Sequence, residues 1–233
     1  MAAFVIVFLT NAKAAARIKT APASDEGEAS AARVSVSSLL ISRFGVLLIA
    51  IFLVSTGHGV ITGQFPNYLD KVFSVAAEQS TLVLSISAVV TLLTLDLIGR
   101  WMGKSGPAPV WLTAVGMKSM MMLALSVLAF AAGGLVISFL PLGIYLVFMQ
   151  GIAWADMTQP ALASRASTAG AGLTQGLLMF AMAMAFGVGG FLGGTFADSF
   201  GFQSLAWLTA AVSIGALVLG FLSVPRKNQA EVS

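Results

Sequence analysis

The sequence predicts an all-α, polytopic membrane protein with six transmembrane helices. Hydrophobic residues make up 58% of the 233 residues and charged residues only 9%, whereas about a quarter of a soluble domain is charged. The apolar residues fall into six runs, each close to the length of about 20 residues with which a helix crosses a bilayer. No run shows the period-two alternation of a membrane strand, so all six are predicted to be helices.

The six runs define a bundle over residues 44–224. They lie approximately at residues 44–64, 80–99, 110–132, 135–156, 172–197 and 203–224, and a turn-like FPNYLDK follows the first. Residues 1–10 form an apolar stub too short to span a bilayer. We interpret it as the end of a preceding helix, with a short interfacial anchor as the alternative. Residues 11–43 are predicted to be a cytoplasmic linker on their polar composition, and residues 225–233 a cytoplasmic tail.

The basic residues predict the orientation. With the linker in the cytoplasm, Lys71 alone lies outside and Lys118 lies within a span. The other ten basic residues are then cytoplasmic: Lys13, Arg17, Lys19, Arg33, Arg43, Arg100, Lys104, Arg165, Arg226 and Lys227. This bias follows the positive-inside rule. It predicts that both termini are cytoplasmic. We expect the chain in a bacterial cytoplasmic (inner) membrane, with membrane lipid as a partner.

The composition also excludes several kinds of function. The chain has no cysteine and one histidine, His58, which excludes thiolate chemistry and a multi-histidine metal site. We predict no metal site, cofactor, catalytic residue or nucleic-acid partner. Gly103-Lys-Ser105-Gly superficially resembles the Gly-x-Ser-Gly of rhomboid proteases, which need a serine inside the membrane beside a histidine. Because Ser105 is predicted in a cytoplasmic loop, the chain is not expected to be an enzyme.

The run at residues 172–197 carries two pairs of glycines four residues apart, a spacing that lets membrane helices pack closely. They are Gly189 with Gly193 and Gly190 with Gly194. Together with Gly176 and Ala185 they resemble the antiporter signature of the major facilitator superfamily, which reads Gly, eight residues, Gly, three residues, Gly-Pro, two residues, Gly-Gly. Ala185 stands for a glycine and Gly190 for the proline. Asp198 belongs to a tail that resembles the turn after this helix in the family.

The segment after the second run, GRWMGKSG at residues 99–106, is predicted to be a tight cytoplasmic loop. It is similar to the superfamily signature Gly-x-x-x-Asp-(Arg/Lys)-x-Gly, in which Gly99, Lys104 and Gly106 match and Gly103 replaces the Asp. Glycines permit a tight turn, and a basic residue there can bind helix-end carbonyls in one gate state. A generic basic loop is the alternative.

The resemblance covers residues 44–224 and implies one six-helix half of a twelve-helix transporter. The antiporter-like signature is usually found in the N-terminal half, but the stub and linker favour the C-terminal half, which is the half we expect. The implied function is secondary active transport of a small solute by alternating access, as proton- or ion-coupled efflux. The missing half is expected to be a separate chain or a second copy. The alternative is a non-transporting accessory subunit of a larger membrane complex, or a fragment of a split transporter.

Polar residues within the spans, and at the outer end of the first span, are the candidate substrate or proton sites. They are His58, Gln64, Asn67, Lys118, Tyr145, Gln150, Asp156 and Gln175. Candidate proton carriers are His58, Asp96 and Asp156. For His58, a structural hydrogen bond to a backbone carbonyl is the alternative.

Two ion pairs are predicted. Asp96 and Lys118 are expected to pair because they lie at similar depth in antiparallel spans; the alternative is that Lys118 extends to the membrane surface. Asp156 and Arg165 flank the next cytoplasmic turn and are candidates for an inner-gate salt bridge, or for a solvated pair.

Overall fold

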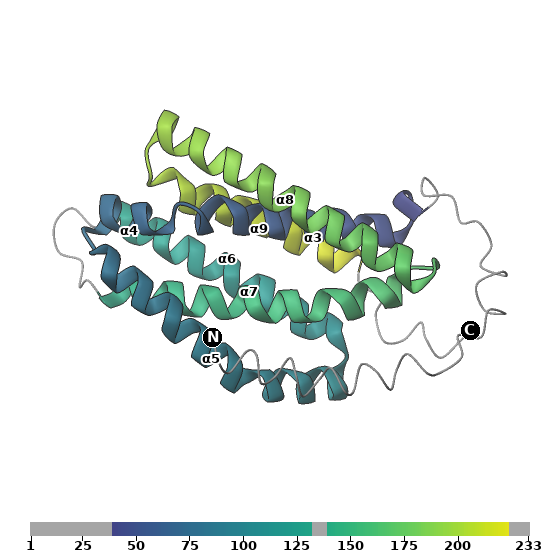
Figure 1. Cartoon of the computed structure of the whole chain (residues 1–233). Helices are drawn as coiled ribbons and strands as arrows, with labels where there is room; N and C mark the ends of the chain where they lie inside the picture. Colours follow the sequence, from purple (N-terminus) through teal and green to yellow (C-terminus); the bar gives the residue numbers. More distant parts are fainter. Residues whose placement is uncertain (1–38, 132–138, 224–233) are drawn as a thin grey trace, which may run out of the picture. The chain divides into compact units, whose positions relative to one another are not determined.

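Seven α-helices make up the part of the chain that the structure, a computed structural model, describes: residues 39–131 and 139–223 (Figure 1). They are α3 (Arg43–Thr62), α4 (Phe65–Phe73), α5 (Ala77–Ser105), α6 (Pro107–Ala131), α7 (Phe139–Ala166), α8 (Ala171–Phe200) and α9 (Ser204–Ser223). All belong to one compact unit, Ser35–Ser233. The stub, the linker up to residue 38 and the tail lie outside the described residues.

All of these helices except the short α4 are long and apolar enough to cross a membrane. This confirms the predicted all-α fold with six transmembrane helices. The helix ends differ from the prediction, because α5 continues to Ser105 and α7 continues to Ala166 through the internal Pro160. The turn-like FPNYLDK is helix α4, which has a proline in its first turn.

The prediction that residues 99–106 form a loop is therefore wrong. Residues 99–105 continue α5, and Gly106 alone separates them from Pro107, the first residue of α6. Gly106 has a φ of +81°, a conformation that glycine adopts without steric cost. Proline is well suited to the first position of a helix, where its missing N–H leaves no hydrogen bond unmade.

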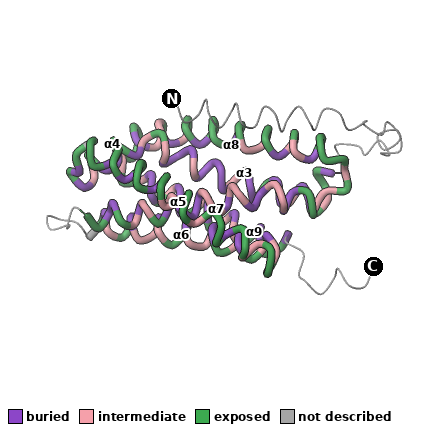
Figure 2. The backbone as a smooth tube through the Cα atoms, turned by 60° about the horizontal axis from the view of Figure 1, so that its bottom comes forward, coloured by how far each residue is buried: buried purple, intermediate pink, exposed green. Residues whose placement is uncertain are grey.

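Helix α3 is the most buried of the six spans. It packs against α8 and α9, while α6 packs against α7 and α9, and α5 contacts α7 more than any other helix. In its most apolar stretch 72% of α3 is buried, against 17% of α5 and 22% of α8. Figure 2 shows the same contrast, with α3 largely purple and α8 carrying green along one edge. The bundle therefore leaves α5 and α8 sparsely covered.

Helices α3 and α8 meet backbone to backbone. A Cβ atom at Gly193 would lie 2.5 Å from the carbonyl oxygen of Val60, and one at Gly189 would collide with the carbonyl oxygen of Thr56. By contrast, a Cβ at Gly190 or Gly194 would meet no atom within 4 Å. The two glycine pairs of the signature thus differ. Gly189 and Gly193 lie in the contact between α8 and α3, whereas Gly190 and Gly194 have free space beside them.

Candidate functional site

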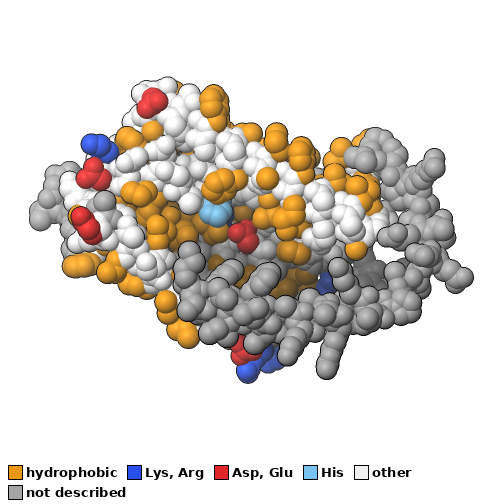
Figure 3. Space-filling view, viewed as in Figure 1, with side chains coloured by type: hydrophobic (Ala, Val, Ile, Leu, Met, Phe, Trp, Pro, Cys, Tyr) orange, Lys and Arg blue, Asp and Glu red, His pale blue; other side chains and the backbone are white. Residues whose placement is uncertain are grey.

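Two half-buried polar candidates, His58 of α3 and Asp156 of α7, belong to the surface that these two helices form between α5 and α8, here called the central face. Helices α8, α3, α7 and α5 contact one another in that order, and Figure 1 shows α8 and α5 on opposite sides of the other two. Figure 3, in the same view, shows the only histidine near the middle of this surface, beside one acidic side chain and among hydrophobic groups.

His58 lies on α3 and is half-buried. Its ring meets the ring of Phe186 on α8 edge to face, with 5.3 Å between the centroids. Its ring nitrogens have no hydrogen-bond partner among the described residues. The alternative, a structural hydrogen bond from His58 to a backbone carbonyl, is therefore not formed. An imidazole whose ring nitrogens make no other hydrogen bond can bind a solute or a proton.

Lys118, near the middle of α6, is 1% exposed. Its Nζ donates a hydrogen bond of 3.3 Å to the carbonyl oxygen of Val54 on α3 and lies 5.7 Å from the ring centroid of Phe148 on α7. A Cβ at Gly151 of α7 would lie 2.7 Å from Lys118 Cγ. The glycine therefore makes room for the lysine inside the bundle, and the alternative in which Lys118 extends to the surface is wrong.

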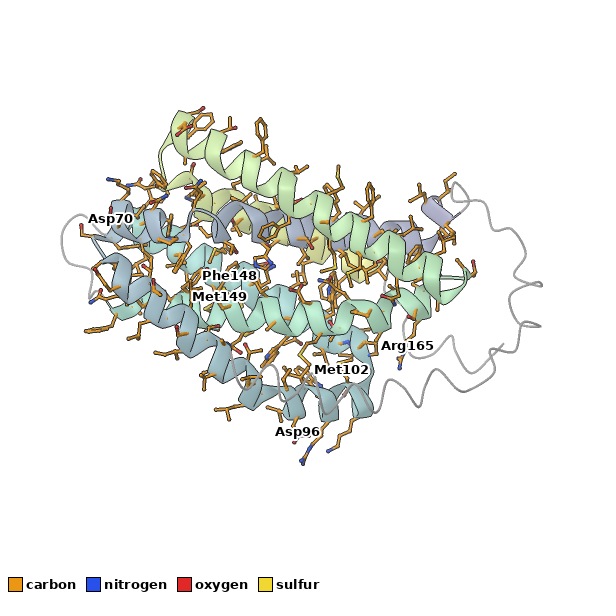
Figure 4. The ribbon with its side chains drawn as sticks, viewed as in Figure 1. Asp70, Asp96, Met102, Phe148, Met149 and Arg165 are labelled. Atoms are coloured by element: carbon orange, nitrogen blue, oxygen red, sulfur yellow. The ribbon has the colours of Figure 1, made fainter. Side chains whose placement is uncertain are left out.

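The predicted pair between Asp96 and Lys118 is also wrong. Asp96 pairs with Arg100, one turn along α5, at 2.7 Å, and both side chains are 74% exposed. Figure 4 shows Asp96 on the outer side of α5, pointing away from the other helices. The two residues do not face each other because α6 packs chiefly on α7 and α9, while α5 packs chiefly on α7.

The carboxylate that interacts electrostatically with Lys118 is Asp156 of α7. Asp156 is half-buried, and its Oδ1 accepts a hydrogen bond of 3.2 Å from Gln159 Nε2. Gln159 is fully buried, and its Oε1 has no partner among the described residues. Buried charges in a membrane are normally compensated by an opposite charge, so Lys118 and Asp156 form a long-range pair without a direct ion bridge.

A bridge between Asp156 and Arg165 is not formed. Both lie on α7, nine residues apart, which corresponds to about 13.5 Å of helix rise. Arg165 lies instead at the turn between α5 and α6, where a Cβ at Gly106 would be 3.1 Å from its Nη1. The arginine therefore joins the end of α7 to this turn.

The other predicted site residues are dispersed. Gln64 and Asn67 bond each other at the start of α4, where Asn67 Nδ2 donates to Gln64 Oε1 at 3.2 Å. Tyr145 is fully buried and stacks on Phe65. Gln175 Nε2 donates to the carbonyl oxygen of Pro160 at 3.3 Å, joining α8 to α7. Four other predicted positions are exposed and do not belong to the central face: Gly99, Lys104, Gly176 and Asp198.

Gln150 links α7 to α5. Its Nε2 donates to the carbonyl oxygen and the Oγ of Ser87, both at 3.1 Å, and its Oε1 accepts from Thr91 Oγ1 at 3.2 Å. We predict that Gln150→Leu lowers the free energy of unfolding in mixed detergent micelles by about 1–2 kcal/mol. Gln79→Leu, at an exposed position of α5, is the matched control and is expected to have little effect. Equal effects would contradict a specific link.

Three participants were not predicted: the carbonyl of Val54, Gly151 and Gln159. Neither a backbone carbonyl nor an absent side chain leaves a signal of its own in one sequence. Gln159 lies three residues after Asp156, a helical spacing at which side chains meet, and this spacing is the signal that could have identified it.

Comparison with known proteins agrees with this architecture. The sequence model of the Major Facilitator Superfamily matches residues 47–233, which include nearly all of α3 and every later helix. No curated protein matches the chain. From this match and the six apolar helices, we conclude that the chain is an integral membrane protein that belongs to the major facilitator superfamily of membrane transporters.

Proposed function

We propose that the chain is one six-helix half of a secondary active transporter that moves a small solute by alternating access, as proton- or ion-coupled efflux. The central face carries the proposal. It presents a half-buried histidine and a half-buried carboxylate between two sparsely covered helices. Transporters of this architecture bind solute at the interface of two repeats, and His58 and Asp156 are the proton carriers we propose. Asp96 is not included, because it lies on the outer side of α5.

A second six-helix half, supplied by a separate chain or a second copy, completes the site in this proposal. The sparse cover of α5 and α8 supports it. So do the open positions of α8, because Gly190 and Gly194 have free space where a side chain would be. Gly190 lies one turn from Phe186, on the same side of α8, so a covering partner would meet both.

We further propose a bacterial inner membrane with both termini in the cytoplasm. Arg43 begins α3, while Lys104 and Arg165 lie in the last turns of α5 and α7. Successive spans of a bundle run antiparallel, so these ends meet at one membrane surface. Lys71, in α4, belongs to the opposite membrane surface. This distribution supports the positive-inside orientation.

Cross-linking tests the missing half, and the absence of cysteine in the chain makes it specific. A thiol-reactive photocrosslinker on Gly190→Cys is expected to capture a second copy or another six-helix chain in native membranes. The same reagent on Met120→Cys, which is 66% exposed on α6, is the control and is expected to capture lipid only.

Native mass of the purified protein completes the test. A one-to-one assembly of six-helix halves that transports a solute after reconstitution supports the proposal. A monomer without cross-links at Gly190→Cys contradicts it. Capture of one copy within a larger, non-transporting complex would favour the accessory-subunit alternative.

A further inference from the structure

We infer that the solute bound at the central face is a lipophilic cation, whose positive charge is recognised by Asp156. The inference rests on the proposed function and adds the charge and polarity of the solute. It follows from which charged group of the site is accessible, from how that group is hydrogen-bonded and from what surrounds it.

The accessible charge of the site is negative. Lys118 is 1% exposed, and its ammonium donates to the carbonyl oxygen of Val54 inside the bundle. Asp156 is half-buried, and Lys118 interacts electrostatically with both Asp156 and His58, so the three side chains lie near one another. An anion approaching this face would therefore meet a carboxylate before it met the ammonium, whereas a cation would be attracted.

The Asp156 carboxylate has unused acceptor capacity. Gln159 Nε2 donates one hydrogen bond to it, and Lys118 acts only through its longer-range charge. An ionised carboxylate can accept about four hydrogen bonds. Lys118 cannot supply them, because its side chain is held between Gly151 and Val54. A cationic solute is the group that would complete this site.

The surroundings are apolar and adaptable. Phe186 lies against His58, and Met182 precedes Phe186 by one turn on the same side of α8. Met149, labelled on α7 in Figure 4, shares a side of that helix with Asp156, seven residues away. Methionine side chains fit varied apolar shapes, and aromatic rings attract cations. Apart from His58 and Asp156, this lining offers few hydrogen-bond partners to a solute rich in hydroxyl groups.

The test compares two probes of similar shape and opposite charge, tetraphenylphosphonium and tetraphenylborate. The full chain, with any half that co-purifies, is placed in nanodiscs of zwitterionic lipid, and binding is corrected for empty nanodiscs. We expect saturable binding of tetraphenylphosphonium only. Asp156→Asn should weaken the binding of tetraphenylphosphonium about thirtyfold, and Asp156→Glu should retain this binding. Asp198→Asn, at an exposed position near the end of α8, is the matched control and should not change it.

Saturable tetraphenylborate binding, or tetraphenylphosphonium binding that Asp156→Asn leaves unchanged, would overturn the inference. If Asp156→Asn does not fold, the comparison of the two probes on the unaltered chain still decides. Transport of a neutral or anionic solute that tetraphenylphosphonium does not inhibit would overturn this inference and leave the proposed function standing. Asp156-dependent binding without transport by any assembly would support the inference and contradict the proposed function.

Discussion

Replacing Gly189 with leucine is expected to disrupt the bundle, whereas the same replacement at the neighbouring Gly190 should leave it folded. A side chain at Gly189 meets the carbonyl oxygen of Thr56 and, at 2.9 Å, the amide nitrogen of Val60. These are backbone atoms of the most buried helix, so they cannot move aside unless α3 and α8 separate. We expect a loss of about 3 kcal/mol or more in the free energy of unfolding, measured as a lower thermal midpoint and loss of monodispersity in mild detergent.

Gly190→Leu is the control because it adds the same volume to the same helix where no atom lies within 4 Å. The bundle should stay folded, with a thermal midpoint much closer to that of the unaltered chain than the midpoint of Gly189→Leu is. Similar midpoints for Gly189→Leu and the unaltered chain would show that α3 and α8 are not in backbone contact.

Neutralising either Lys118 or Asp156 is expected to lower the free energy of unfolding. Neutralising both should lower it by less than the sum of the two single effects. Lys118→Met leaves the Asp156 carboxylate without its opposite charge, and Asp156→Asn leaves a fully buried ammonium. A buried charge that loses its opposite charge destabilises the fold. We therefore expect a coupling energy of about 1 kcal/mol or more in a double-mutant cycle, measured by unfolding in mixed micelles.

The control cycle combines Lys118→Met with Asp96→Asn. Asp96 pairs with Arg100 on the exposed side of α5, so these two changes should be additive within about 0.5 kcal/mol. Additivity in the Asp156 cycle would refute the link between Lys118 and Asp156. Coupling in the Asp96 cycle would instead restore the pair predicted from the sequence.

The number and type of the spans could be predicted, because long apolar runs have few ways to satisfy their backbone in lipid. Their ends could not. Gly106 and Pro107 look like part of a loop in the sequence, yet a single glycine with positive φ joins two helices, and the proline takes the first position of the second. Pro160 lies within α7, which continues past it.

The chemistry of the site was easier to predict than its pairing. His58, Lys118 and Asp156 are conspicuous because polar groups are costly in an apolar span. Depth along a helix, however, does not specify which way a side chain faces or which helix it meets. Asp96 therefore looked suitable as a partner for Lys118, although α5 turns it outward.

The contact between α3 and α8 also limits how the bundle can move. Gly59 and Gly193 bring the two backbones together with no layer of side chains between them. Sliding by one residue would bring the larger neighbours of these glycines into the contact, so the two helices must travel as one rigid piece. Helix α5 is the least buried span, and Gln150 of α7 holds it by side-chain hydrogen bonds to Ser87 and Thr91. Opening and closing of the bundle is therefore expected to displace α5, with α3 and α8 as the stationary frame.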